Sequence, residues 1–399
     1  MSSINRIRLG ILLYIFFMRL VESQSLTIMC RGKDKRSRFV AEAKREGLIK
    51  EVTVRKRERT THQMTLYAIT KKGIRCLKEN MPGSFLENLS ESELRSLAIF
   101  DKDEYNVESR KRIADISSAM IMAMEMGGRI PAGVINRHYA FGEDSSSNNC
   151  IPRTETYKTL SEFIGACFSE EEYRKLGFFC SNESNDNQIC FYDAAYVKQA
   201  VSYTNDPKTA RDYYKGREIG LFMSPKQSLL VYYAPFFGMS WSRWQTKPEL
   251  DALSIWNHRY APQEIRYSRQ LSALLVVKNP TQFANLYNDV DHACKDEEVF
   301  GDRFDHVYLA EQTAYGAELL RWLMSYSDEE IDENCTELLL SKRLATRNHR
   351  PSKDVFRYRD LDGREAMCGF HMDIKRMLTL DKWARRHPEQ NFIVFLVEP

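Results

Sequence analysis

The hydrophobic period of the chain changes at Gly47, and this change constrains the fold of the first eighty residues. Before it, residues 35–46 carry apolar residues on one face, as an amphipathic helix does. After it, residues 48–55 alternate apolar and polar side chains, which is the pattern of a β-strand. Because glycine is common where helices stop, we predict that Gly47 ends this helix and that Asp34 caps its start.

Further elements are predicted on both sides of this change of period. Residues 4–22 predict a helix that is apolar nearly all round, and a short helical turn follows before Gly32. Residues 64–69 predict the return strand of a basic hairpin, and Thr70 is placed to cap a last helix. Helix, short helix, helix and basic hairpin together are typical of a winged helix-turn-helix domain, which we expect over residues 1–80.

Charge is distributed unevenly along the chain. Residues 1–80 hold 19 Lys+Arg against 7 Asp+Glu, whereas the remaining 319 residues hold 39 against 48. Basic side chains on a groove-entering helix and an adjoining hairpin gain affinity for double-stranded DNA by releasing counterions. A solvated basic face, a protein-binding winged helix and an anionic membrane surface are the alternatives. The predicted DNA-binding residues are Lys33, Lys35, Arg36, Arg38, Arg55, Lys56, Arg57 and Arg59.

The rest of the chain predicts a helical connector over residues 81–140 and a mixed α/β domain over 141–399. In the connector, residues 106–126 form one long amphipathic pattern that is expected to bridge the two domains. From Arg217 onward predicted strands alternate with predicted helices, so we expect one mixed sheet covered by helices, an α/β fold that is α+β overall. The predicted strands are 218–223, 229–233, a short one near 239–241, 271–277, 306–310 and, at the end of the same sheet, 391–397; the predicted helices are 248–260, 280–287 and 313–326. We interpret the methionines of the connector as core packing rather than metal ligands: Met120, Met122, Met124 and Met126.

Three segments of the α/β region resemble proteins of mobile elements in Gram-positive bacteria: Arg217-Glu218-Ile219-Gly220-Leu221, Leu229–Tyr233 and Met239-Ser240-Trp241. With a winged helix before them, the chain resembles the replication-relaxation family of plasmid and conjugative-element proteins. The resemblance implies an N-terminal domain that binds DNA and a C-terminal domain of degenerate restriction-endonuclease-like fold. It further implies an accessory role in replication or relaxation at an origin, or in transcriptional regulation, with a relaxase or replication protein as partner.

Catalysis is the first alternative function. A nuclease of this fold needs an acid on one strand and an acid-x-Lys pair on the next, gathered around Mg²⁺. Residues 229–233 contain neither type of residue, so we expect no metal, no cofactor and no enzyme activity. If the chain were a metal-dependent nuclease, Glu218 and Asp251 would be its weak candidate catalytic residues. A protein-interaction adaptor is the second alternative function.

The nine cysteines of the chain bear on the cellular compartment in which the protein works. Their number is odd and no two have CxxC spacing, so neither a zinc site nor a redox dithiol is predicted. Reduced, buried thiols are typical of cytosolic proteins. We therefore expect a cytoplasmic protein.

The apolar run Leu9–Met18 has three interpretations. It is half the length of a membrane span, so no membrane partner is expected. Preceded by Arg6 and Arg8 it resembles a signal peptide, although Arg19 closes the run early. As a helix it must be covered on a second side, either by residues 113–126 of the same chain or by a second copy. Of these two covers we expect the second copy, and hence a homodimer.

Overall fold

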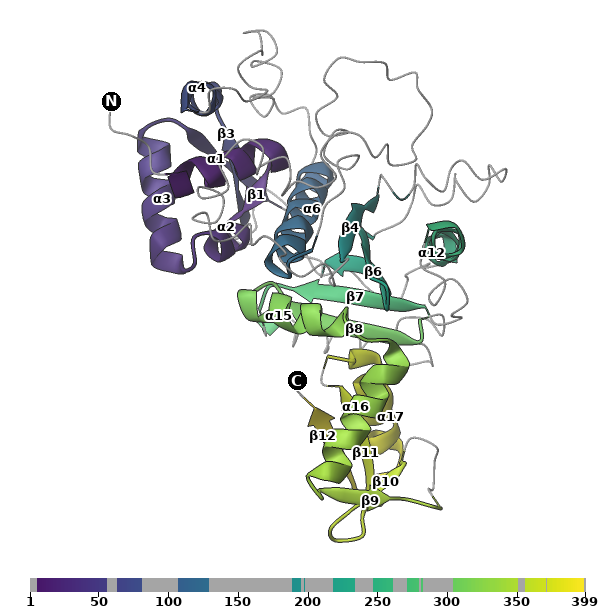
Figure 1. The fold of residues 1–399 in the computed structure, drawn as a ribbon. Helices are drawn as coiled ribbons and strands as arrows, with labels where there is room; N and C mark the ends of the chain where they lie inside the picture. The colour runs from purple at the N-terminus through teal and green to yellow at the C-terminus, as the bar shows by residue number, and fades with distance from the viewer. Residues whose placement is uncertain are drawn as a thin grey trace.

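The computed structural model shows a mixed α/β chain with three sheets (Figure 1). The residues that the structure describes are 6–55, 63–80, 107–128, 189–194, 197, 218–233, 247–260, 271–279, 281–282, 304–350, 356–370 and 372–397. Of the predicted connector 81–140, this includes 107–128.

The N-terminal part is a helical module closed by a small antiparallel sheet of order β1-β3-β2. The helices and strands predicted for residues 4–80 are present, but the first helix ends at Met18, and residues 21–22, predicted as its end, form a short strand that pairs with residues 66–67. Their bounds are α1 (Arg6–Met18), β1 (Val21–Glu22), α2 (Ser23–Met29), α3 (Lys33–Arg45), β2 (Ile49–Arg55), β3 (Gln63–Ile69) and α4 (Lys71–Asn80).

Two glycines set the ends of α3. Gly47 has a φ of 72°, and the Leu48 N–H donates to the Ala43 carbonyl at 2.8 Å, so the predicted helix stop is confirmed. The predicted cap at Asp34 is wrong. Gly32, with a φ of 137°, is the residue before the helix, which therefore starts at Lys33. Asp34 falls in the first turn, where its charge lies near the unpaired N–H groups.

The predicted cap at Thr70 is confirmed and fixes α4 against the end of α3. Its hydroxyl donates to the Gly47 carbonyl at 2.6 Å and accepts from the Gly73 N–H at 3.1 Å. This close approach leaves no room at Gly73, where a Cβ atom would lie 2.2 Å from the Leu48 carbonyl oxygen.

We expect Gly73→Ala to destabilise the protein by about 1–3 kcal/mol, because the added methyl group forces the backbone of α4 away from the turn. Urea unfolding followed by circular dichroism measures the change. Lys72→Ala, on an exposed position of the same helix, is the matched control and should stay within about 0.5 kcal/mol of the wild type. Equal stability of Gly73→Ala and Lys72→Ala would contradict this packing.

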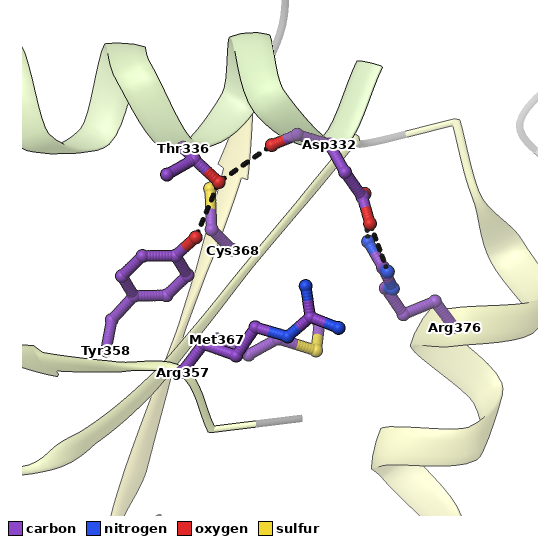
Figure 2. Close-up of a pocket in the computed structure, with 7 residues that line it drawn as sticks. All are labelled: Asp332, Thr336, Arg357, Tyr358, Met367, Cys368 and Arg376. Carbon is purple, nitrogen blue, oxygen red and sulfur yellow. Dashed lines mark hydrogen bonds and ion pairs between the residues drawn. The ribbon is translucent and has the colours of Figure 1, made fainter. Parts of the chain in front are cut away.

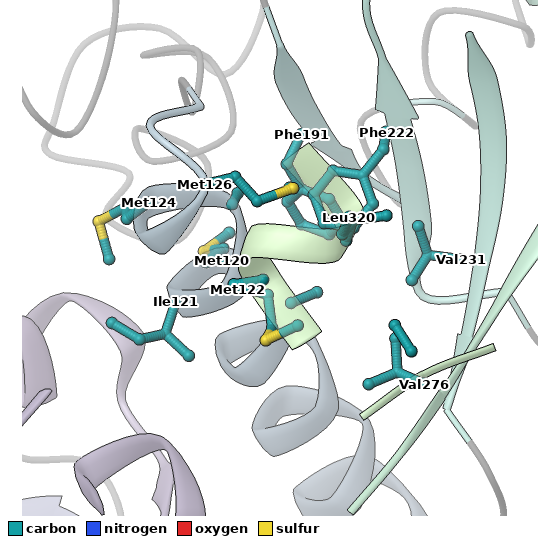
Figure 3. Packing of buried hydrophobic residues seen from close by; sticks show 14 of the residues in the cluster. Met120, Ile121, Met122, Met124, Met126, Phe191, Phe222, Val231, Val276 and Leu320 are labelled. Carbon is teal, nitrogen blue, oxygen red and sulfur yellow. The ribbon is translucent and has the colours of Figure 1, made fainter. Parts of the chain in front are cut away.

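Helix α6 (Val107–Glu125) joins the N-terminal module to the central sheet, as predicted. It contacts α1, α2, β1 and β2 on the module side, and β4 and α15 on the other. Its three methionines and Met126, which follows it, are buried between these elements, so their interpretation as core packing is confirmed (Figure 3).

The same helix covers α1. From Leu9 to Phe16 every apolar side chain of α1 is buried within the single chain. The Tyr14 hydroxyl donates to the Ser117 carbonyl of α6 at 2.7 Å. The intrachain cover therefore exists, and α1 provides no reason for a second copy. Within the described ranges, no helix combines the length and apolarity that crossing a bilayer requires.

The central sheet has the order β4-β5-β6-β7-β8. Its first three strands are antiparallel, and β6, β7 and β8 are parallel. The strands predicted from the apolar runs match β5 to β8. The predicted strand near 239–241 lies outside the described residues, as does all of the predicted helix 280–287 except residues 281–282. The bounds are β4 (Cys190–Asp193), β5 (Gly220–Met223), β6 (Ser228–Tyr233), α12 (Lys247–Tyr260), β7 (Ser272–Val277), β8 (His306–Glu311) and α15 (Ala314–Leu323).

The α/β region contains a second sheet, of four strands, after the central one. The prediction of a single mixed sheet in this region is therefore wrong. Strand β12, predicted to close the central sheet, pairs in parallel with β11 in the order β12-β11-β10-β9. An apolar run predicts a strand but does not indicate the strand with which it pairs. Strands β9 and β10 are each three residues long, which is too short for a periodic hydrophobic pattern. The bounds are α16 (Asp328–Ser341), β9 (Ala345–Arg347), β10 (Tyr358–Asp360), β11 (Glu365–Phe370), α17 (Ile374–Arg386) and β12 (Phe392–Val397).

Candidate nucleic-acid interface

The outer face of α3 presents basic side chains to solvent. Lys35, Arg38 and Arg45 are exposed and are spaced three and seven residues apart, so they share one side of the helix. Phe39 and Ala43, roughly a quarter turn away around the helix axis, are buried. In the part of the chain that the structure describes, no hydrogen bond or ion pair engages the charged groups of the three basic residues. Their charges are therefore available to a ligand.

Arg36 behaves differently from its neighbours. Its guanidinium donates to the Ser23 hydroxyl at 2.8 Å and to the Thr27 hydroxyl at 3.2 Å, both on α2. Two residues along a helix correspond to about 200°, so Arg36 and Arg38 point to nearly opposite sides. Arg36 therefore holds α3 against α2, and the prediction that it contacts DNA is not supported by its geometry.

We expect Arg36→Ala to lower stability by about 1–2 kcal/mol, because it removes two hydrogen bonds between α2 and α3. Arg38→Ala should leave stability within about 0.5 kcal/mol of the wild type, since its side chain is exposed. Thermal and urea unfolding of the two variants compares them directly. A larger loss of stability in Arg38→Ala than in Arg36→Ala would reverse these assignments.

Acidic neighbours neutralise part of the predicted basic surface. Lys44 forms an ion pair with Glu51 of β2 at 2.6 Å, and this hydrogen bond raises the pKa of Lys44. Asp34 and Glu42 are exposed on α3 itself. Arg45 was absent from the predicted site although it follows Arg38 by seven residues, a helical spacing that could have revealed it.

Of the predicted hairpin residues, the structure describes one. Arg55 lies opposite Gln63 at the end of the described β2–β3 ladder. The other three lie outside the described residues: Lys56, Arg57 and Arg59. Lys33, the remaining predicted residue, is the first residue of α3.

Buried polar contacts fix the module on the central sheet. Glu22 of β1 forms an ion pair with Lys278, the residue after β7, and desolvation raises the pKa of Glu22. Gln312, after β8, donates to the Ser25 hydroxyl at 3.0 Å and accepts from Gln24 at 3.0 Å through its carbonyl. These contacts involve β1 and α2, while α3 lies on the far side of the module from the sheet (Figure 1). Among the described residues, the central sheet therefore leaves the basic face uncovered.

The candidate nuclease residues do not form a comparable site. Glu218 is buried shortly before β5, and its carbonyl accepts from Arg112 of α6 at 2.9 Å. Asp251 is exposed on α12. Strand β6 carries no acid and no lysine, and no cluster of three metal-binding side chains occurs within the described ranges. The nuclease alternative therefore gains no support from this part of the chain.

Comparison with known proteins assigns no relative to this chain. No family model matches it, and neither a curated protein nor a solved structure matches it significantly. We therefore infer the ligand of the interface from the charge and exposure of its side chains and from the packing of α3.

Proposed function

We propose that residues 6–80 form a winged helix-turn-helix domain that binds double-stranded DNA. The element order α1-β1-α2-α3-β2-β3 and the sheet order β1-β3-β2 support this assignment. The observation that carries the proposal is the outer face of α3, where Lys35, Arg38 and Arg45 are exposed and form no hydrogen bond or ion pair with any other described residue. A helix fits the major groove of B-DNA, and α3 would enter it.

The side chains of α3 suit different parts of a duplex. Lys33 and Lys35 lie in the first turn, from which recognition helices reach base edges and phosphates. Arg38, one turn further, has the planar guanidinium that bonds guanine in a bidentate manner. Arg45, at the last residue of α3, is placed to contact a phosphate. Ala41 is a small exposed residue between them and allows the helix to approach closely.

The wider role follows the resemblance to replication-relaxation proteins. We propose a cytoplasmic accessory factor of a mobile element, acting at an origin beside a relaxase or replication protein, or as a regulator. The region after residue 140 would supply a restriction-endonuclease-like scaffold without its catalytic residues. Its support is the mixed five-stranded central sheet, whose strand β6 lacks the required acid and lysine.

Selection of oligonucleotides from a random duplex library by the purified full-length chain tests the proposal. We expect one motif to be enriched, with an affinity that falls as salt rises because phosphate contacts release counterions. Failure to retain any duplex at low salt would favour the protein-interaction adaptor. Cleavage of a plasmid with Mg²⁺ or Mn²⁺ that is abolished by Glu218→Ala would instead favour the nuclease.

A further inference from the structure

Two cysteines that are 33 residues apart in the sequence meet between α16 and β11. Cys335 of α16 is 1% exposed and Cys368 of β11 is 8% exposed. The Cys368 thiol donates to the Cys335 carbonyl at 3.4 Å, which places its sulfur against the backbone of Cys335. Cysteines this close can be bridged without a large movement of the backbone.

One of the two sulfurs is reached by a cavity. Cys368 lines a space of about 110 Å³ beneath α16, together with Thr336, Tyr358 and Arg376 (Figure 2). A larger depression of about 820 Å³ shares Thr336 and Tyr358 with it, so the cavity continues toward the surface. A space of this size holds several water molecules, and hydrogen peroxide is only slightly larger than water.

We propose that Cys335 and Cys368 form a peroxide-sensitive dithiol that closes to an intramolecular disulfide. The Cys368 thiolate attacks one peroxide oxygen, the O–O bond breaks, and the second oxygen leaves as water after taking up a proton. This step gives a sulfenic acid at Cys368. The Cys335 sulfur then attacks the Cys368 sulfur, the S–O bond breaks, and a second water leaves. Two thiols and one peroxide thus give one disulfide and two waters.

The surroundings favour Cys368 as the attacking sulfur. The neighbouring Cys335 side chain lowers the pKa of Cys368, whereas Cys368 and burial raise the pKa of Cys335. Arg376 adds a positive charge that also lowers the pKa of Cys368, while burial and the Asp332 carboxylate oppose these effects. Its guanidinium is held in place by Asp332 through contacts of 2.7 and 2.9 Å. Cys368 is also the thiol that lines the cavity, whereas Cys335 does not line it.

The disulfide would fix the helix that links the two larger sheets. At its start, α16 carries Asp328, which accepts hydrogen bonds from Gln227 at 2.8 Å and from Ser272 at 3.1 Å in the central sheet. Further along, Cys335 lies over β11 of the second sheet. Oxidation would therefore tie α16 covalently to the second sheet while Asp328 holds it to the central one.

Peroxide titration of the reduced full-length chain tests the proposal. Free thiols are counted after treatment, and peptide mapping identifies linked fragments. We expect a loss of two of the nine thiols, recovery of a peptide pair joining Cys335 to Cys368, and full reversal by dithiothreitol. Cys335→Ser should stop at a sulfenic acid on Cys368 that dimedone labels, and Cys368→Ser should leave Cys335 unreacted.

Cys190→Ser is the matched control, because Cys190 lies on β4 of the central sheet and should not affect the Cys335–Cys368 link. Alanine variants at positions 335 and 368 repeat the test if a serine variant does not fold, as judged by circular dichroism. Loss of thiols without a Cys335–Cys368 peptide pair would overturn the proposal. So would oxidation of Cys335 in Cys368→Ser at the wild-type rate, because that result would show that Cys368 is not the attacking group.

Discussion

Replacing Lys35, Arg38 and Arg45 together by alanine should weaken binding to the selected duplex by about 100-fold or more. Each contact from a recognition helix is worth about 1–3 kcal/mol, and about 1.4 kcal/mol corresponds to a tenfold change in affinity. The dependence of log affinity on log salt should also become shallower, by about one unit for each phosphate-binding side chain that is removed. Fluorescence anisotropy at several salt concentrations measures both quantities.

The control for this variant removes the same charge from a distant surface. Lys342, Arg343 and Arg386 are exposed near the second sheet, far along the chain from α3. Their triple alanine variant should bind DNA almost as the wild type does, because exposed charges beyond about 10 Å are screened at physiological salt. An equal loss of affinity in both triple variants would mean that net charge, rather than the face of α3, attracts the DNA.

Leu13→Asp should unfold the N-terminal module. The Leu13 side chain is 0% exposed, within the helix that packs against α6 and β3. Placing an unpaired carboxylate there is expected to cost about 4 kcal/mol or more, which is a large part of the roughly 5–15 kcal/mol that stabilises a typical domain. Loss of helical circular dichroism and a lower urea midpoint would report the effect.

Ile7→Asp is the matched control for Leu13→Asp, since Ile7 lies on the same helix and is 45% exposed. It should stay within about 0.5 kcal/mol of the wild type. Light scattering separates unfolding from dissociation. A folded Leu13→Asp chain of 46.7 kDa, produced from a wild-type species of twice that mass, would show that α1 lies between two copies instead.

The candidate interface was partly predictable from the sequence because its signals are local. Charge, helical spacing and the change of period at Gly47 place Lys35 and Arg38 on one helix that precedes a hairpin. The orientation of Arg36 was not predictable in this way. Whether an arginine points to solvent or to a neighbouring helix depends on where Ser23 and Thr27 lie, and that is set by the packing of α2 on α3.

The sequence by itself determined the local elements of this protein, because caps, glycine stops and hydrophobic periods act over a few residues. It placed α3, the hairpin β2–β3, helix α6 and the strands β5 to β8 close to their observed bounds. Only the tertiary structure decided which surfaces meet. It packed α6 against α1, placed β12 in a second sheet instead of the central one, and brought Cys335 to Cys368. Each of these contacts joins segments that are distant in the chain, and many different partners would satisfy the same apolar surface or strand edge, so local sequence patterns do not specify them.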